Sequence, residues 1–297
     1  MHAIFYRSIL VSFVLTIFFG CSSDEHATEI PNDEPTNLEA ITMLDQSYGT
    51  HTQQTYDIYL PEGRSSDKTK IILLVHGGGW TSGDKADMNE FVTLFQDKHP
   101  AHAIVNMNYV LATLPNTPAF PNQFLDIDAV IDKLTVDHQE LHIQPEFGLI
   151  GVSAGAHLSL QYDYVYDTDD QVKFVADIVG PTDFTDPFYT NDPQFQFALD
   201  FLVDANQYPD GTNLAVAVSP ALQVSDASSP SLLFYGTDDP LVPLSNGDRL
   251  DSALSQHNIT HKFSIYAGGH GNDWSEADML QLEHQVSTYI TTYLGID

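Results

Sequence analysis

The sequence contains very few cysteines and very few positively charged side chains. Cys21 is the only cysteine among 297 residues, so no disulfide can form within the chain. Ten lysines and arginines stand against 41 aspartates and glutamates, which gives a formal net charge of −31. A chain with so little positive charge has no basic surface that could follow a phosphate backbone. This excludes nucleic-acid binding and disfavours polyanionic substrates.

The sequence also lacks the residue spacings that are typical of metal sites in proteins. It contains no His-Glu-x-x-His pair and no calcium-loop spacing. The acidic run Asp167–Asp170 is interpreted as a solvated loop rather than a metal site. We therefore expect neither a metal ion nor any other cofactor.

Long apolar runs are missing except near the N-terminus. Met1–Arg7 carries one positive charge, Ile9–Phe19 is almost entirely apolar, and Gly20 and Cys21 follow. Because this run is shorter than the about 20 residues that span a bilayer, it predicts a signal peptide over residues 1–20. Residues 21–40 are polar and contain prolines, which predicts a flexible acidic tether. A folded domain is then expected over residues 41–297.

The position of Cys21 resembles the lipidation site of bacterial lipoproteins, and the acidic residues after it resemble the export signal of surface lipoproteins. This resemblance implies a lipid anchor on Cys21 that holds the protein to a membrane without spanning it. The expected location is the outer membrane of a Gram-negative bacterium, at the cell surface. A cleaved signal and a secreted protein are the alternative. The sequence does not indicate an oligomeric state.

Five residues in the middle of the chain form the pattern Gly-x-Ser-x-Gly. This pattern, Gly151–Gly155, directly follows the apolar run Phe147–Ile150. A strand that ends at a serine and continues into a helix is a nucleophile elbow, and small flanking residues permit its tight turn. Ser153 would then lie at a helix N-terminus, where the helix dipole favours negative charge. A glycine-rich turn with an incidental serine is the alternative.

A serine nucleophile needs a base, and several histidines are available. His270 lies in a glycine-rich loop directly after the apolar run Phe263–Tyr266 and is the predicted base. His157, one turn into the predicted elbow helix, is expected to pack structurally. His76 is expected to order the loop that it begins.

The acid that orients such a histidine lies between the serine and the histidine in chains with this elbow. Asp238 and Asp239 both follow the apolar run Ser231–Tyr235. Asp239 is ranked first because it precedes a proline, which favours an extended backbone. Three further acids are interpreted as loop or helix-cap residues: Asp183, Asp273 and Glu276.

A run of three glycines follows His76 and an apolar, strand-like segment. Consecutive glycines let the main chain approach a ligand closely, and N–H groups aimed at a developing oxyanion lower the reaction barrier. The predicted donors are the N–H groups of Gly78, Gly79 and Ala154. A flexible turn without this role is the alternative.

Apolar, strand-like runs alternate with helical patterns along the rest of the chain. This alternation predicts an α/β fold with a mostly parallel central sheet and helices on both faces. The predicted strands are Thr55–Leu60, Lys70–Val75, Ala103–Asn108, Phe147–Val152, Val172–Val179, Ser231–Tyr235 and His261–Tyr266. The irregular, aromatic-rich segment Pro181–Ser219 is either the wall of an acyl pocket or a packed surface subdomain.

Together these motifs resemble an α/β-hydrolase-fold carboxylesterase. The most similar group includes small bacterial esterases, enzymes like feruloyl and acetyl-xylan esterases, and kynurenine formamidases. The shared patterns are His76–Trp80, Gly151–Leu158, Gly236–Pro243 and Gly268–Gly271, and the third of them aligns the acid with Asp239. The segment Asn108–Thr113 lacks the arginine and proline that relatives often have there.

The resemblance implies an α/β-hydrolase catalytic domain over residues 41–297 that hydrolyses small neutral carboxylic esters through an acyl-enzyme. Acetyl or feruloyl groups on plant or algal glycans are among the implied substrates, and no cofactor is needed. An amidase or arylformamidase with the same Ser153, Asp239 and His270 is one alternative. A catalytically silent surface lipoprotein that binds a partner is another.

Overall fold

The computed structural model describes residues 38–113 and 115–296. The predicted signal peptide, Cys21 and the predicted tether up to residue 37 lie outside the described residues. The first strand, β1, begins at Ile41. No helix in the described ranges is long and apolar enough to cross a membrane.

The described part of the chain contains one sheet of eight strands in the order β1-β2-β4-β3-β5-β6-β7-β8. β1 and β2 pair antiparallel, β2 also pairs antiparallel with β4, and all other neighbours are parallel. The strands are β1 (Ile41–Ser47), β2 (Thr55–Leu60), β3 (Ile71–Val75), β4 (Ala103–Met107), β5 (Phe147–Val152), β6 (Val172–Ile178), β7 (Ser231–Gly236) and β8 (His261–Tyr266). The prediction of a mostly parallel sheet is confirmed.

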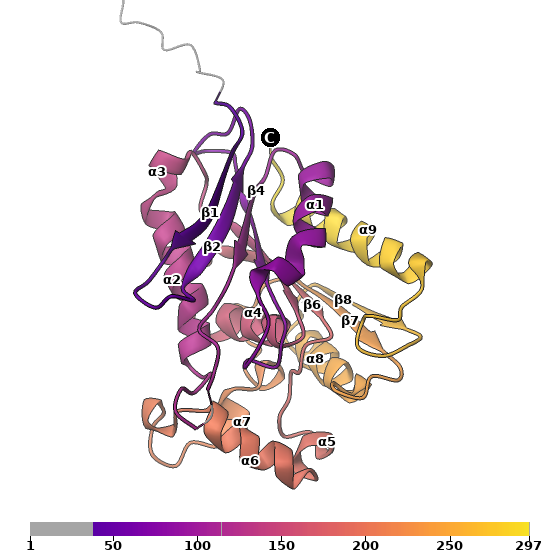
Figure 1. Cartoon of the computed structure of the whole chain (residues 1–297). Coiled ribbons are helices and arrows are strands. Elements are labelled where there is room, and N and C mark those ends of the chain that lie inside the picture. Colours follow the sequence, from indigo (N-terminus) through magenta and orange to yellow (C-terminus); the bar gives the residue numbers. More distant parts are fainter. Residues whose placement is uncertain (1–37, 114, 297) are drawn as a thin grey trace, which may run out of the picture. The chain divides into compact units, whose positions relative to one another are not determined.

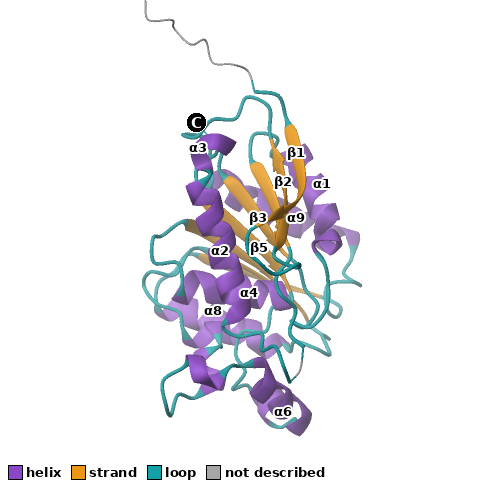
Figure 2. Ribbon diagram, turned by 60° about the vertical axis from the view of Figure 1, so that its left-hand side comes forward, coloured by secondary structure: helices purple, strands orange, loops and turns teal. Residues whose placement is uncertain are grey.

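Helices cover both faces of this sheet, as predicted (Figure 2). α2 (Asn122–Val136), α4 (Ala154–Val165) and α8 (Leu244–Gln256) pack on one face. α1 (Asn89–Lys98) and α9 (Glu276–Tyr293) pack on the other. The short helix α3 (His138–Leu141) follows α2, η1 (Lys85–Met88) precedes α1, and η3 (Pro220–Leu222) precedes β7.

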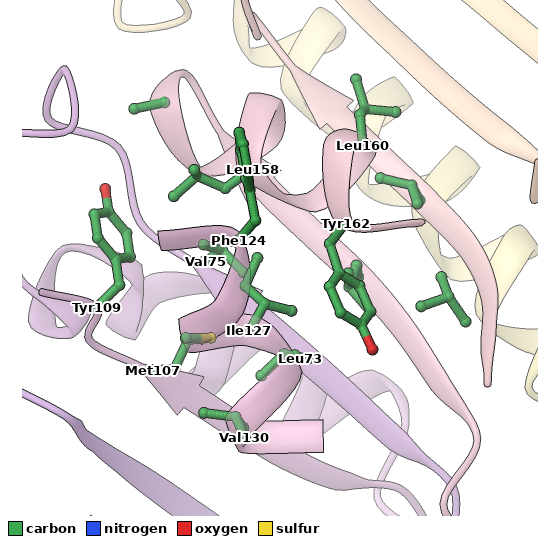
Figure 3. Packing of buried hydrophobic residues seen from close by; sticks show 14 of the residues in the cluster. Leu73, Val75, Met107, Tyr109, Phe124, Ile127, Val130, Leu158, Leu160 and Tyr162 are labelled. Atoms are coloured by element: carbon green, nitrogen blue, oxygen red, sulfur yellow. The ribbon is translucent and has the colours of Figure 1, made fainter. Parts of the chain in front are cut away.

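The central strands are apolar throughout because both of their faces are covered. All five residues of β3 are buried, and they alternate between the two cores. Leu73 and Val75 face α2 and α4, where they meet side chains such as Phe124 and Leu158 (Figure 3). Ile72 faces the opposite core with α1 and α9. This is the continuous apolar pattern expected of a parallel strand between two helical layers.

The edge strand β1 was not among the predicted strands. Most of its side chains are exposed, so it lacks the apolar run by which the central strands were found. Besides its backbone pairing with β2, it is linked to that strand by Lys85, whose Nζ lies 2.6 Å from Asp45 Oδ1 and 2.5 Å from Asp57 Oδ1. A strand of this kind is recognised only through its pairing with β2.

The segment Pro181–Ser219 was predicted to be irregular, and this prediction is wrong. It contains α5 (Pro187–Thr190), α6 (Pro193–Leu202), η2 (Ala205–Gln207) and α7 (Leu214–Ala217), which lie together beyond one end of the sheet (Figure 1). Each begins after an aspartate or asparagine whose side chain accepts a backbone N–H bond. The dipeptides Asp186-Pro187 and Asp192-Pro193 are helix-start signals that could have revealed two of them.

Candidate active site

Ser153 lies at the sharp turn between β5 and α4. Its backbone has φ 53° and ψ −118°, a conformation that is uncommon for a residue with a side chain. The Ser153 N–H donates to the carbonyl of Ile178 over 2.8 Å, which ties the turn to the end of β6. A Cβ on Gly155 would lie 2.1 Å from the carbonyl oxygen of Val75. The elbow therefore requires glycine at position 155 because α4 starts against the end of β3.

The structure brings Ser153, His270 and Asp239 together into one hydrogen-bonded chain. His270 Nε2 lies 2.9 Å from Ser153 Oγ, and His270 Nδ1 lies 2.6 Å from Asp239 Oδ2. A carboxylate can only accept, so Nδ1 carries the hydrogen and Nε2 is left to accept from the serine hydroxyl. This arrangement can remove the hydroxyl proton when Ser153 attacks an electrophile.

Asp239 is buried and well supplied with hydrogen-bond donors. Its Oδ1 accepts the backbone N–H groups of Leu241 at 2.8 Å and Val242 at 3.0 Å. Burial raises the pKa of this carboxyl group, but the bonds from His270 and the two backbone N–H groups outweigh it and leave the pKa below its usual value. Asp239 therefore stays ionised next to the imidazole.

None of the other four acids considered from the sequence hydrogen-bonds to His270. Asp238 is exposed and accepts from the hydroxyl of Thr237. Asp183 pairs with Arg249. Asp273 accepts the N–H of Gly269 at 2.8 Å and so holds the loop that carries His270. Glu276 lies in the first turn of α9.

The glycine-rich loop after β3 lies beside the elbow. Gly78 has φ 117°, and a Cβ there would lie 2.0 Å from the carbonyl oxygen of Ser82. Gly79 and Ala154 line the same cleft as Ser153, whereas Gly78 is not among the lining residues. Within the described ranges, no protein acceptor takes the N–H groups of Gly78, Gly79 or Ala154. Donors free at this place can bind an oxyanion.

The two other histidines singled out from the sequence have structural surroundings. His157 is fully buried between the indole N–H of Trp80, 3.2 Å from its Nδ1, and the carbonyl of Val218, 2.8 Å from its Nε2. Burial lowers its pKa to about 4, so it stays neutral. His76 is also buried, and its ring stacks on Tyr109 with 4.3 Å between ring centroids. Both occupy the structural places expected of them.

Two residues that hold the glycine-rich loop were missed in the sequence. The Tyr109 hydroxyl donates to the carbonyl oxygens of His76 at 3.0 Å and Gly77 at 3.3 Å. The Gln123 side-chain amide donates to the carbonyl of Trp80 at 2.8 Å. Gln123 lies in no motif, and the comparison of the segment Asn108–Thr113 with relatives did not predict this role for Tyr109. Each residue acts through a contact with a distant part of the chain.

Replacement Tyr109→Phe tests this support. We expect turnover of an ester to fall roughly tenfold, because a small displacement of a loop at a reaction centre is costly, with a stability loss of about 1 kcal/mol. Steady-state kinetics and thermal melting would measure the two effects. Tyr48→Phe is the matched control, since it removes a 2.8 Å bond to the carbonyl of Asn108 outside the cleft. Equal turnover in the two variants would contradict this role.

A cleft of about 440 Å³ opens at Ser153. Its volume suits a small organic ligand. It is lined by Gly79, Trp80, Ser153, Ala154, Pro181, Phe188, Tyr189, Asp192, Phe195, Pro240, Leu241 and Val242. The segment Pro181–Ser219 thus supplies much of the wall, through α5, α6 and the residues next to them. Its remaining aromatic side chains do not line the cleft, and Phe184 is buried against Trp80.

Solved structures of esterases share this fold. A truncated carbohydrate esterase from gut microbiota superposes with a TM-score of 0.67 over 85% of this chain and 98% of that chain, at 19% identity. A thermophilic esterase from Thermogutta terrifontis, solved with butyrate bound, has a TM-score of 0.68 over 89% of this chain and 96% of its own, at 18% identity. At this level of identity the likeness shows a common fold.

Among curated proteins, arylacetamide deacetylase from mouse is 26% identical over 157 residues. The match covers 49% of this chain and 36% of the mouse protein, so the chain spans about a third of the length of this relative.

The family comparison covers more of the chain. The BD-FAE family model matches residues 56–254, which is about two thirds of the sequence. The matched range includes all of β2 but its first residue, β3 to β7, the elbow at Ser153 and Asp239, while His270 follows it. With the sheet order and the esterase neighbours, this match shows that the chain belongs to the BD-FAE family of α/β-hydrolase-fold esterases.

Proposed function

We propose that the protein is a serine carboxylesterase. The observation that supports this most is the unbroken chain of hydrogen bonds from Ser153, which lines a cleft, through His270 to Asp239. Ser153 Oγ attacks the ester carbonyl while His270 Nε2 takes its proton, and Asp239 stabilises the imidazolium. His270 then protonates the leaving alcohol, and an acyl-enzyme remains on Ser153.

The second half of the reaction uses the same groups. His270 takes a proton from water, the hydroxide attacks the acyl carbonyl, and the acid leaves as Ser153 regains its proton. In both halves the N–H groups of Gly78, Gly79 and Ala154 bind the oxyanion. Gly79 and Ala154 lie in the cleft wall beside the nucleophile, and Gly78 adjoins Gly79.

The proposed substrates are small neutral carboxylic esters, with acetyl or feruloyl groups on glycans as specific candidates. The cleft is mainly apolar and aromatic, which suits a short acyl chain or an aromatic ring. The likeness to a carbohydrate esterase from gut microbiota supports an acylated glycan as the larger partner. Rates on acetyl, butyryl and feruloyl esters, and on acetylated xylan, would separate these candidates.

Amide hydrolysis is a second candidate, favoured by the match to a protein named arylacetamide deacetylase. The same serine, histidine and acid can cleave either bond, because both reactions pass through a tetrahedral oxyanion intermediate. The test compares phenyl acetate with acetanilide, and phenyl formate with formanilide. A kcat/KM for the anilide equal to that for the ester would make this candidate the better description.

We also propose that a lipid on Cys21 anchors the enzyme to the outer membrane. In a Gram-negative host we expect the wild type in the membrane fraction and Cys21→Ser soluble or unprocessed, because Cys21 is the only cysteine. Fractionation and intact-mass measurement check this. A membrane form whose mass shows no added lipid would refute the anchor, and a processed soluble wild type would indicate secretion.

A further inference from the structure

The cleft at Ser153 has one formally charged side chain in its lining. Asp192 lies in the turn between α5 and α6 and faces the cleft together with Tyr189 and Phe195 from either side of it in the sequence. No lysine or arginine is among the described lining residues. A ligand in the cleft therefore meets a negative charge that no positive side chain of the lining balances.

Hydrogen bonds hold the backbone N–H of Asp192 and one of its two carboxylate oxygens. The Asp192 N–H donates to the carbonyl of Tyr189 over 3.1 Å, and Oδ1 accepts the N–H of Gln194 over 2.9 Å. Within the described ranges Oδ2 accepts no hydrogen bond and forms no ion pair. Arg249, which could have neutralised an acid of this segment, pairs with Asp183 and Asp186 instead. Oδ2 is thus free to meet a ligand.

Three aromatic side chains, Phe188, Tyr189 and Phe195, line the same cleft as this carboxylate. Tyr189 and Phe195 stack with 4.4 Å between ring centroids, and Phe188 meets Tyr189 edge-on at 5.2 Å. The faces of aromatic rings are electron-rich and attract cations, most of all quaternary ammonium groups. A carboxylate and aromatic side chains that line one cleft offer two attractions for the same kind of ligand.

We propose that Asp192 makes the cleft selective for esters that carry an ammonium group and against esters that carry a carboxylate. The inference rests on the proposed ester hydrolysis and adds the charge of the substrate. The charge of the whole chain, −31, acts in the same direction at longer range. Neutral esters remain substrates, at rates between those of the two charged classes.

Isosteric esters test this selectivity. Butyrylcholine and 3,3-dimethylbutyl butyrate differ in the charge of the alcohol. The 4-nitrophenyl esters of 4-(trimethylammonio)butyrate and 5,5-dimethylhexanoate differ in the charge of the acyl group. We expect kcat/KM of the wild type to favour the cationic ester by roughly threefold to tenfold in at least one pair, mainly through KM, and less at high salt.

Asp192→Asn should remove most of that preference, and the net charge of the chain and the aromatic rings account for what remains. The fold should be retained, because asparagine caps a helix as well as aspartate does. Asp204→Asn is the matched control: Asp204 caps η2 by the same bond, to the N–H of Asn206, and does not line the cleft. A wild type without cationic preference in either pair would overturn the inference, as would equal loss of the preference in both variants. A wild type that hydrolyses neither the four esters nor 4-nitrophenyl acetate would overturn the proposed function itself.

Discussion

Replacement Ser153→Ala is expected to abolish ester hydrolysis while the fold is retained. The side chain supplies the nucleophilic oxygen, which lies 2.9 Å from His270 Nε2. Losing a serine nucleophile of this kind lowers kcat by about four to six orders of magnitude. Hydrolysis of 4-nitrophenyl acetate by purified wild type and variant would measure the effect, and circular dichroism would verify the fold.

Ser159→Ala is a suitable control for this experiment. Ser159 lies in the same helix, and its hydroxyl is bonded within α4, to the carbonyl of Gly155 at 2.8 Å. Its loss should leave turnover within a few-fold of the wild type and cost about 1 kcal/mol of stability. Near-normal turnover in Ser153→Ala would show that Ser153 is not the nucleophile and would contradict the proposed mechanism. An inactive wild type would instead favour the surface protein that binds a partner without catalysis.

The second large effect is expected for Asp239→Asn. An amide at position 239 can donate to His270 Nδ1, and the ring hydrogen would then lie on Nε2. An Nε2 that carries a hydrogen cannot accept the proton of Ser153. A fall in kcat of about 10³–10⁴ is expected, with little change in KM. Steady-state kinetics on 4-nitrophenyl acetate measures both constants.

Asp238→Asn is the neighbouring control and removes the same charge. Asp238 is exposed, and its carboxylate accepts from the Thr237 hydroxyl at 2.8 Å rather than from His270. Its kcat should stay within a few-fold of the wild type. If Asp238→Asn proved the more damaging change, the role of the orienting acid would belong to Asp238.

The local sequence does not establish which of these two aspartates contacts His270. Both follow β7, both lie between the serine and the histidine in the chain, and a proline after Asp239 was the local reason to prefer it. The hydrogen bond to His270 depends on how the loop after β7 turns. Here the N–H groups of Leu241 and Val242 hold the Asp239 carboxylate. Neighbouring residues in one loop differ in direction, and only the folded backbone decides that direction.

The sequence alone determined the parallel sheet, the elbow at Ser153 and the histidine placed after the last strand. These features are local: a strand buried on both faces needs a run of apolar residues, and a tight strand-to-helix turn needs small ones. It did not reveal β1, whose exposed side chains leave no such run, nor the short helices after β6.

Tertiary structure decided what surrounds the serine. Tyr109 and Gln123 hold the glycine-rich loop, and Asp192 lies in the cleft wall. In each case the fold brings together segments that are far apart in the chain. Such contacts leave no periodic pattern in the sequence, because the local preferences of a residue do not depend on which distant residue its side chain meets. The positions of these side chains are determined only when the sheet has assembled and the ends of its strands lie next to one another.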